Sequence, residues 1–345
     1  MKNYIACIGT AAVRGSRGIY SLEVDVDDGR MRVISSAKSF NSGYVVFSPD
    51  RRYVYSTQEC MTFSGRASGG AAAYSMDDCG NLTFINSVNT GGQLPCHISI
   101  NLDGSELYIS SYLNGCVSVH RIQDDGSIGG VYKVIQHPVY HGIRPSIHCS
   151  TVTEDGRFLC SLNVTAHVIS FYDIKSGNYD EVSRFEFDPP YNKRPRQIVF
   201  TADSAYLLTE FGKEAVVFDY DPDSADFLKV KQVKLLYPSG PELPKSAASC
   251  IKLSPDRKCL ACSVRGYNLI TIFRIGEDGT LSEPVFNKIK GKTPRDFSFT
   301  PEGKHILVGA QQSDTMELYS LNDDGTMELM SGDLHLPSCF CVAFR

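Results

Sequence analysis

Short apolar runs alternate with polar turns along the whole chain, and one arrangement of them recurs six times. An apolar run leads into a polar turn with an acidic residue, and a second apolar run follows directly, as in "YVVFSPDRRYVYS" from Tyr44. The turn acids follow one another at 53, 52, 48, 53 and 46 residues: Asp50, Asp103, Asp155, Asp203, Asp256 and Glu302. Self-similarity at this period, made of strands rather than helices, predicts a β-propeller.

Two more strands complete each repeat, which predicts blades of four antiparallel strands. After the second run come segments such as "GCVSVHRI" from Gly115 and "AVVFDYD" from Ala215. The chain ends in "CFCVAFR", an inner-strand sequence with nothing after it, and it begins with three strands that lack an inner strand. The ends complement each other. The sequence therefore predicts an all-β, seven-bladed propeller in one domain, residues 1–345, whose last blade is closed by strands from both termini.

Composition excludes several functional classes. Charged residues are 21% of the 345 and the formal net charge is −5, which argues against a general nucleic-acid binder. No segment approaches the roughly 18 apolar residues of a membrane span, and the start lacks the apolar region of a secretory signal. The 12 cysteines are scattered through strand-like runs. Reduced thiols in a cytoplasmic protein are the simplest interpretation, and Cys259 and Cys262, three apart in a strand, are not expected to share a metal.

The predicted topology brings a set of polar residues to one mouth of the central channel. Inner strands begin, and the strands after them end, at the face opposite the repeated acidic turns. The residues expected there are His97, His148, Arg196 and Arg295 before inner strands, and Tyr112, Asn163, Glu210 and Arg265 after the strands that follow. Three arginines and two histidines would surround one carboxylate. This combination suits an anionic ligand and supplies groups that can move protons.

His148 on its own would be an ordinary polar residue at the start of a strand. A single histidine in such a place is more often a structural hydrogen-bonding group than a catalyst. Its predicted neighbours at the mouth favour a chemical role. The remaining histidines do not fall at these positions and are expected to pack or to lie on the surface, with His141 as a rim contact: His120, His137, His167, His305 and His335.

Several segments resemble the seven-bladed propeller lactonases, a family that includes bacterial 6-phosphogluconolactonase. The fungal 3-carboxy-cis,cis-muconate lactonizing enzyme is similar in fold. The resemblance covers nearly the whole chain and is most specific in "GGAAAYSMDDCGNLTF", "RPRQIVF", "LLTEFGKEAVVFDY" and "TPRDFSFTPEGKHILVG". It implies His148, Arg196, Glu210 and Arg265 as the catalytic residues. The chain departs from the family pattern at Gln197, at Asn163 and at Ser111–Tyr112, which bears on the substrate more than on the site.

The resemblance and the predicted cluster together suggest metal-independent hydrolysis of a sugar-acid lactone. Water would attack the ring carbonyl with Glu210 or His148 as general base, and Arg196 and Arg265 would stabilise the oxyanion or hold an anionic substituent. We expect no cofactor and no metal. Substrate contacts are expected from His97, Tyr112, Arg144, Gln197 and Arg295. A phosphorylated substrate would favour further basic contacts, from Lys193, Arg194, Arg144 or Arg295.

Two other functions remain open at this stage. A cycloisomerase that closes or opens a lactone on an unsaturated diacid would need the same arginines and the same proton carriers. A propeller without catalytic activity, used as a protein-binding platform, is compatible with the fold. The expected partner is a small anionic lactone or carboxylate rather than nucleic acid or membrane, and the protein is expected to be a monomer or a weak homo-oligomer.

Overall fold

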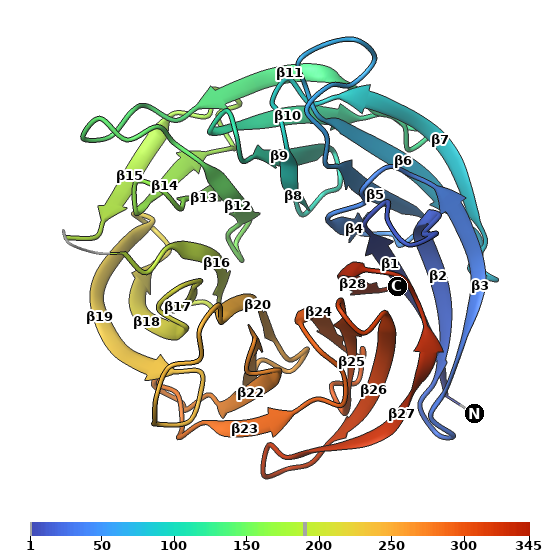
Figure 1. Ribbon diagram of the computed structural model, residues 1–345. Coiled ribbons are helices and arrows are strands. Elements are labelled where there is room, and N and C mark those ends of the chain that lie inside the picture. Colours follow the sequence, from blue (N-terminus) through green and yellow to red (C-terminus); the bar gives the residue numbers. More distant parts are fainter. Residues whose placement is uncertain (1, 189–191) are drawn as a thin grey trace.

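Seven sheets stand around a central axis, as Figure 1 shows. The computed structural model describes residues 2–188 and 192–345, and in these residues 28 strands form seven four-stranded antiparallel sheets with no helix. The prediction of an all-β, seven-bladed propeller is confirmed.

Each blade runs from its innermost to its outermost strand in chain order. The first three are β4 (Val45–Phe47), β5 (Tyr53–Gln58), β6 (Gly70–Met76) and β7 (Leu82–Asn89); β8 (Pro95–Ile100), β9 (Glu106–Ser111), β10 (Cys116–Ile122) and β11 (Ile128–Gln136); and β12 (Ile147–Val152), β13 (Phe158–Asn163), β14 (Val168–Asp173) and β15 (Glu181–Glu186). The next three are β16 (Pro195–Phe200), β17 (Ser204–Thr209), β18 (Glu214–Asp221) and β19 (Asp226–Leu235); β20 (Ala247–Leu253), β21 (Cys259–Arg265), β22 (Leu269–Arg274) and β23 (Val285–Lys288); and β24 (Pro294–Phe299), β25 (His305–Ala310), β26 (Thr315–Leu321) and β27 (Met327–His335).

The seventh blade joins the two ends of the chain. Its inner strand is β28 (Cys339–Phe344), which pairs with β1 (Asn3–Thr10), and β2 (Gly18–Asp25) and β3 (Arg30–Lys38) follow outward. Cys7 lies opposite Ala343 in this register. The expected closure by strands from both termini is confirmed, because the C-terminal strand β28 pairs with the N-terminal strand β1 and completes the seventh four-stranded blade.

The repeated turn has a local cause in its acidic residue. A serine or threonine two positions earlier donates its hydroxyl to the aspartate over 2.6 Å in three blades, at Ser48–Asp50, Thr153–Asp155 and Ser254–Asp256. This side-chain bond stabilises a tight turn between the inner strand and the next. These turns form one face of the ring, here called the turn face, and the opposite face is called the site face.

The hydrophobic core lies between neighbouring blades rather than at one centre. Phe171 of the third blade, for example, packs with Ile198 and Phe218 of the fourth in one buried cluster. Similar clusters lie between other neighbouring pairs of blades, and one of them joins the seventh blade to the sixth through Val342 and Met316. Burial of apolar surface between the sheets therefore holds the ring together and fixes the strand ends at both faces.

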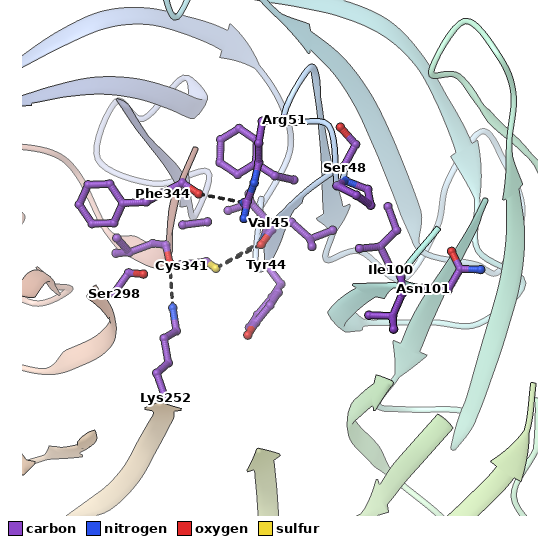
Figure 2. Close-up of a pocket in the computed structure, with 16 residues that line it drawn as sticks. Tyr44, Val45, Ser48, Arg51, Ile100, Asn101, Lys252, Ser298, Cys341 and Phe344 are labelled. Atoms are coloured by element: carbon purple, nitrogen blue, oxygen red, sulfur yellow. Dashed lines mark hydrogen bonds between the residues drawn. The ribbon is translucent and has the colours of Figure 1, made fainter. Parts of the chain in front are cut away.

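The turn face carries a cavity of its own. It has a volume of about 450 Å³ and lies between the inner strands of the first, second, fifth, sixth and seventh blades. Figure 2 shows Lys252 at its wall, with Nζ donating to the backbone oxygen of Val342 over 2.8 Å. Asp296 accepts from the Val342 amide over 2.7 Å and lies 3.3 Å from Nζ of Lys252. None of the residues predicted for the site lines this cavity.

Candidate active site

A β-bulge recurs in the inner strands at the site face. In β16, Pro195 pairs with Thr209 and Gln197 pairs with Leu208, so Arg196 has no partner on β17. A bulge turns the unpaired residue's side chain away from the regular alternation, which is a common device near functional sites. Among the described strands, six blades have this bulge, at Cys96, His148, Arg196, Ser249, Arg295 and Phe340. These six residues are called the bulge ring.

Strained backbone precedes the bulge ring in several blades. Leu94 and Thr293 have φ values of 52° and 63°, in the left-handed region that branched side chains rarely adopt. Each stands two residues before a member of the bulge ring. Such strain persists only where the surrounding structure enforces it, and it clusters at functional sites. The same conformation occurs two residues before the corresponding positions of three further blades, at Asn41, Arg194 and Ser338.

Glu210 is the centre of the most highly charged part of the mouth. Nη1 of Arg196 donates to Oε1 of Glu210 over 2.9 Å, and Nη2 of Arg265 donates to the same oxygen over 2.8 Å. Arg196 is only 5% exposed, and its Nε donates to the backbone oxygen of Ser249. The backbone of Glu210 is held as well, because its amide donates to Arg194 and its carbonyl accepts from Ala248.

These contacts decide the protonation of the ion pair. Burial acts to raise the pKa of Glu210, but the charges of Arg196 and Arg265 outweigh it, so the pKa lies below its ordinary value. Burial, together with the neighbouring arginines Arg196 and Arg295, lowers the pKa of Arg265 to about 10. Glu210 is therefore ionised at neutral pH and is a weak base.

His148 lies beside this pair as a neutral imidazole. Burial, and then the charges of Arg196 and Arg295, hold its pKa well below the ordinary value. Its Nδ1 is buried without a hydrogen-bond partner in the described part of the chain. The ring meets the edge of Tyr112, with ring centroids 6.4 Å apart at 88°. The imidazole therefore has a ring nitrogen whose hydrogen-bonding capacity no described residue uses.

Arg295 supplies a third guanidinium, and its donors have no partner among the residues that the structure describes. Its side chain makes no hydrogen bond or ion pair within residues 2–188 and 192–345, and it stacks on Phe340 with its guanidinium carbon 4.8 Å from the ring centroid. Burial and the charge of Arg196 lower its pKa, although Glu59 and Glu210 act in the opposite direction. An unpaired, partly desolvated guanidinium is a strong site for a carboxylate, phosphate or oxyanion.

Glu59 is a second carboxylate at the mouth, which the sequence analysis missed when it expected only one. It follows β5 directly. Its amide donates to the backbone oxygen of Asn41, and its own backbone oxygen accepts from the side-chain Nδ2 of Asn41. Its carboxylate fills the place where Gly43 lacks a side chain, since a Cβ on Gly43 would lie 2.1 Å from Oε1. In the first blade, Gly43 occupies the position that corresponds to the bulge-ring residues of the other six blades. Burial raises the pKa of Glu59, and Arg295 and Arg196 lower it in part.

Two of the predicted substrate contacts lie deeper than the mouth. His97 and Gln197 each follow a bulge-ring residue and are 5% and 7% exposed. His97 stacks on Tyr44 and lies 3.5 Å from the thiol of Cys149, and burial lowers its pKa to about 3. Gln197 accepts from the amide of Ile251, which joins the fourth blade to the fifth. Both residues support the floor of the site.

Of the basic residues expected to contact a phosphate, Arg295 lies at the mouth, whereas Arg144, Lys193 and Arg194 face solvent or contact other groups. Arg144 is exposed. Lys193 pairs with Glu214, with 2.5 Å between Nζ and Oε1, and Arg194 stacks on Phe211 at 4.3 Å. His141 is exposed and lies 3.5 Å from a carboxylate oxygen of Glu186. The structure therefore brings together His148, Arg196, Glu210, Arg265, Arg295 and Tyr112 from the predicted set, with Glu59 added.

In residues 2–188 and 192–345, no group of three or more His, Cys, Asp and Glu side chains is arranged to hold a metal ion. The same residues include no helix long and apolar enough to cross a bilayer.

Comparison with known proteins places this geometry in a family. Residues 5–344 match the family described as Lactonase, 7-bladed beta-propeller. The chain belongs to this lactonase family. A relative from Bacillus subtilis, named 6-phosphogluconolactonase, is 26% identical over 100% of this chain and 99% of its own length. The 6-phosphogluconolactonase of Pectobacterium carotovorum is 24% identical over 81% of this chain and 80% of its own.

A solved structure carries a related name. The periplasmic gluconolactonase of Pseudomonas aeruginosa is 25% identical to this chain. The match covers 99% of this chain and 99% of that one, with a TM-score of 0.89. The names of these relatives support a lactonase at the level of the family, and none of them supports a cycloisomerase. They differ in whether the lactone carries a phosphate.

Proposed function

We propose that this lactonase-family protein hydrolyses a sugar-acid lactone, such as 6-phosphogluconolactone, at the mouth of the bulge ring. The observation that carries the proposal is the arrangement of Arg196 and Arg265 on one oxygen of Glu210, next to a neutral His148. Charge-assisted donors there face an acid–base group in a site shielded from bulk water. That combination is what acyl transfer to water requires.

Glu210 positions the arginines, and His148 moves the proton. Because Glu210 is held ionised by two guanidinium groups, its basicity is low. His148 accepts a proton from water as the water oxygen attacks the lactone carbonyl. The tetrahedral oxyanion is stabilised by the donors of Arg295 and Arg196. The ring C–O bond then breaks, and the imidazolium returns its proton to the leaving alkoxide, which gives an open hydroxy acid.

An anionic substrate would make His148 a better base. In the unliganded site, burial and then the charges of three arginines depress the pKa of the imidazole. A carboxylate or phosphate on the substrate partly cancels that positive charge, which raises the pKa of His148 towards the working pH. Anion binding and proton transfer are therefore coupled through the same guanidinium groups.

Glu59 contributes an acceptor for the hydroxyl groups of the substrate. Its carboxylate has no hydrogen bond or ion pair to any residue that the structure describes, although it is near enough to Arg295 and Arg196 for their charges to act on its pKa. Sugar acids offer several hydroxyl donors, and a desolvated carboxylate accepts such donors strongly. This contact favours a polyhydroxylated lactone over a bare ring.

A pH-stat assay of lactone opening over a panel of substrates tests the proposal. The panel contains 6-phosphogluconolactone, unphosphorylated aldonolactones and a muconolactone, each corrected for spontaneous hydrolysis. We expect acceleration of the aldonolactones and loss of it in Arg196→Gln. Spontaneous rates with every member would refute lactone hydrolysis and favour a binding platform, and opening of the muconolactone alone would favour a cycloisomerase.

A further inference from the structure

A second polar cavity adjoins the active site on the same face. It has a volume of about 470 Å³ and lies between the fifth and sixth blades. Its walls come from the loops before β20 and β24 and from the ends of β21 and β25, all of which lie at the site face. Arg265, which holds Glu210 at the mouth, also lines this cavity. We call it the lateral groove.

The lateral groove is positively charged. Lys245, Arg265 and Lys292 line it, and no aspartate or glutamate does. Neither lysine forms an ion pair with a residue that the structure describes, and both are exposed. This distinguishes them from Lys193, which is paired with Glu214. Their charge is therefore available to a ligand and is screened only by solvent and salt.

Neutral hydrogen-bond donors complete the lining. Asn268 accepts from the Thr293 amide through its Oδ1, over 2.9 Å, and this contact fixes the side chain. Its Nδ2 makes no hydrogen bond within residues 2–188 and 192–345. The amides of Gln311 and Gln312 lie in the same wall. Cationic donors combined with neutral amide donors, without a competing acid, suit the several acceptor oxygens of a phosphate monoester.

Arg265 connects the groove to the reacting centre. Its Nη2 is used by Glu210, whereas its Nε is buried and has no hydrogen-bond partner in the described residues. An unpaired buried donor on a guanidinium is costly and is usually satisfied by a ligand or water. A substrate whose carbonyl lies at the mouth can extend along Arg265 and place its distal end in the groove.

We infer that the lateral groove, through Lys245, Lys292 and Arg265, binds the phosphate group of a phosphorylated sugar-acid lactone. The inference rests on the proposed lactonase activity of the adjoining mouth and assigns the substrate class. Two lysines without ion-pair partners in the described residues contribute more binding free energy to a dianionic phosphate than to a neutral hydroxymethyl group. The groove thereby selects a phosphorylated lactone over its unphosphorylated counterpart.

The test compares 6-phosphogluconolactone, gluconolactone and glucarolactone, whose distal end is a carboxylate. For each variant the measured quantity is the ratio of kcat/KM between the phosphorylated and the plain lactone. In the double variant Lys245→Ala with Lys292→Ala, that ratio falls by roughly tenfold, as the loss of two charge-assisted contacts implies. The matched control, Arg17→Ala with Arg66→Ala, removes two exposed cations from loops at the same face, after β1 and β5, and leaves the ratio unchanged.

Equilibrium binding separates failure of the inference from failure of the proposed activity. Calorimetric titration with the stable products, 6-phosphogluconate and gluconate, needs no turnover. We expect wild type to bind 6-phosphogluconate about tenfold more tightly than the double variant does. Equal binding by the two proteins, or an unchanged kcat/KM ratio in an active enzyme, overturns the phosphate groove while leaving lactone hydrolysis intact. A greater effect on glucarolactone than on the phosphorylated lactone assigns the groove to a carboxylate and also overturns it.

Discussion

Arg196 and Glu210 form a nearly buried ion pair, with 2.9 Å between Nη1 and Oε1, that joins an inner strand of the fourth blade to the end of the strand beside it. Arg265 of the fifth blade shares the same oxygen. Two guanidinium groups from neighbouring blades therefore depend on one carboxylate for charge balance. The mouth is a single electrostatic unit, and a change at one member reaches the others.

Removal of the charge on Glu210 disables the site. Glu210→Gln keeps the shape but leaves Arg196 and Arg265 without a counter-charge, so the guanidinium groups repel each other and shift. We expect kcat/KM to fall by about 10²–10³ and the free energy of unfolding to fall by roughly 1–3 kcal/mol. Steady-state kinetics and thermal unfolding measure the two effects. Glu214→Gln, at the Lys193 pair, is the matched control, and an equal loss there would contradict the special place of Glu210.

Protonation of His148 opposes folding at low pH. Its folded pKa is depressed, so the unfolded chain binds a proton that the folded chain excludes. Its contribution to stability is therefore complete above about pH 6.5 and is lost as the pH falls below that value. In His148→Gln the free energy of unfolding should fall less steeply with acid, by up to about 1.4 kcal/mol per pH unit.

Chemical denaturation at a series of pH values measures this slope. The buried His97, whose pKa is also lowered, is present in both proteins and cancels in the difference. The exposed His335→Gln serves as control. Identical slopes for wild type and His148→Gln would show that the imidazole is not held neutral.

Glu59 should discriminate between substrates by their hydroxyl groups. Glu59→Gln loses a charged acceptor, so KM for gluconolactone should rise by about 5- to 20-fold, while δ-valerolactone, which has no hydroxyl groups, should be affected little. Because burial raises the pKa of this carboxylate, the acceptor is also lost earlier than usual as the pH falls. The KM of wild type for gluconolactone should therefore rise in mild acid. Equal changes for both lactones would indicate a structural role.

The pair between Lys252 and Asp296 should matter for stability and not for selection among substrates. Burial acts against the charge on Lys252, but Asp296 outweighs it and raises the pKa of the lysine. Asp296→Ala leaves this ammonium without a counter-charge and the Val342 amide without its acceptor, so the melting temperature should fall by several degrees. A second change, Lys252→Met, should recover part of the loss. If the melting temperature does not recover at all, loss of the Lys252–Asp296 pair is not the cause of its fall.

The fold was predictable because the strand–turn–strand pattern that forms each blade is repeated along the sequence. Six copies of the strand–turn–strand unit mark six blades, and the unmatched ends at Tyr4 and Arg345 supply the seventh. The face of the site followed from strand direction alone, which predicts that His148, Arg196, Glu210 and Arg265 lie together.

The remaining details of the site depend on geometry that a linear pattern does not carry. A bulge shifts the register by one residue, so Arg196 reaches the mouth while Gln197 turns to the floor. Glu59 could have been found by the rule that identified Glu210, since both follow the second strand of a blade. Lys245 and Lys292 are 47 residues apart in the numbering and meet only because the fifth and sixth blades are neighbours.

The most direct measurement of lactone hydrolysis at this mouth follows the oxygen of water. Wild type is given 6-phosphogluconolactone in ¹⁸O-labelled water, and the product is analysed by mass spectrometry after the spontaneous reaction is subtracted. The account predicts an enzyme-dependent product with one heavy oxygen in its carboxylate, and loss of that product in His148→Gln. An enzyme-dependent product without solvent oxygen, or no product above the spontaneous background, would contradict it.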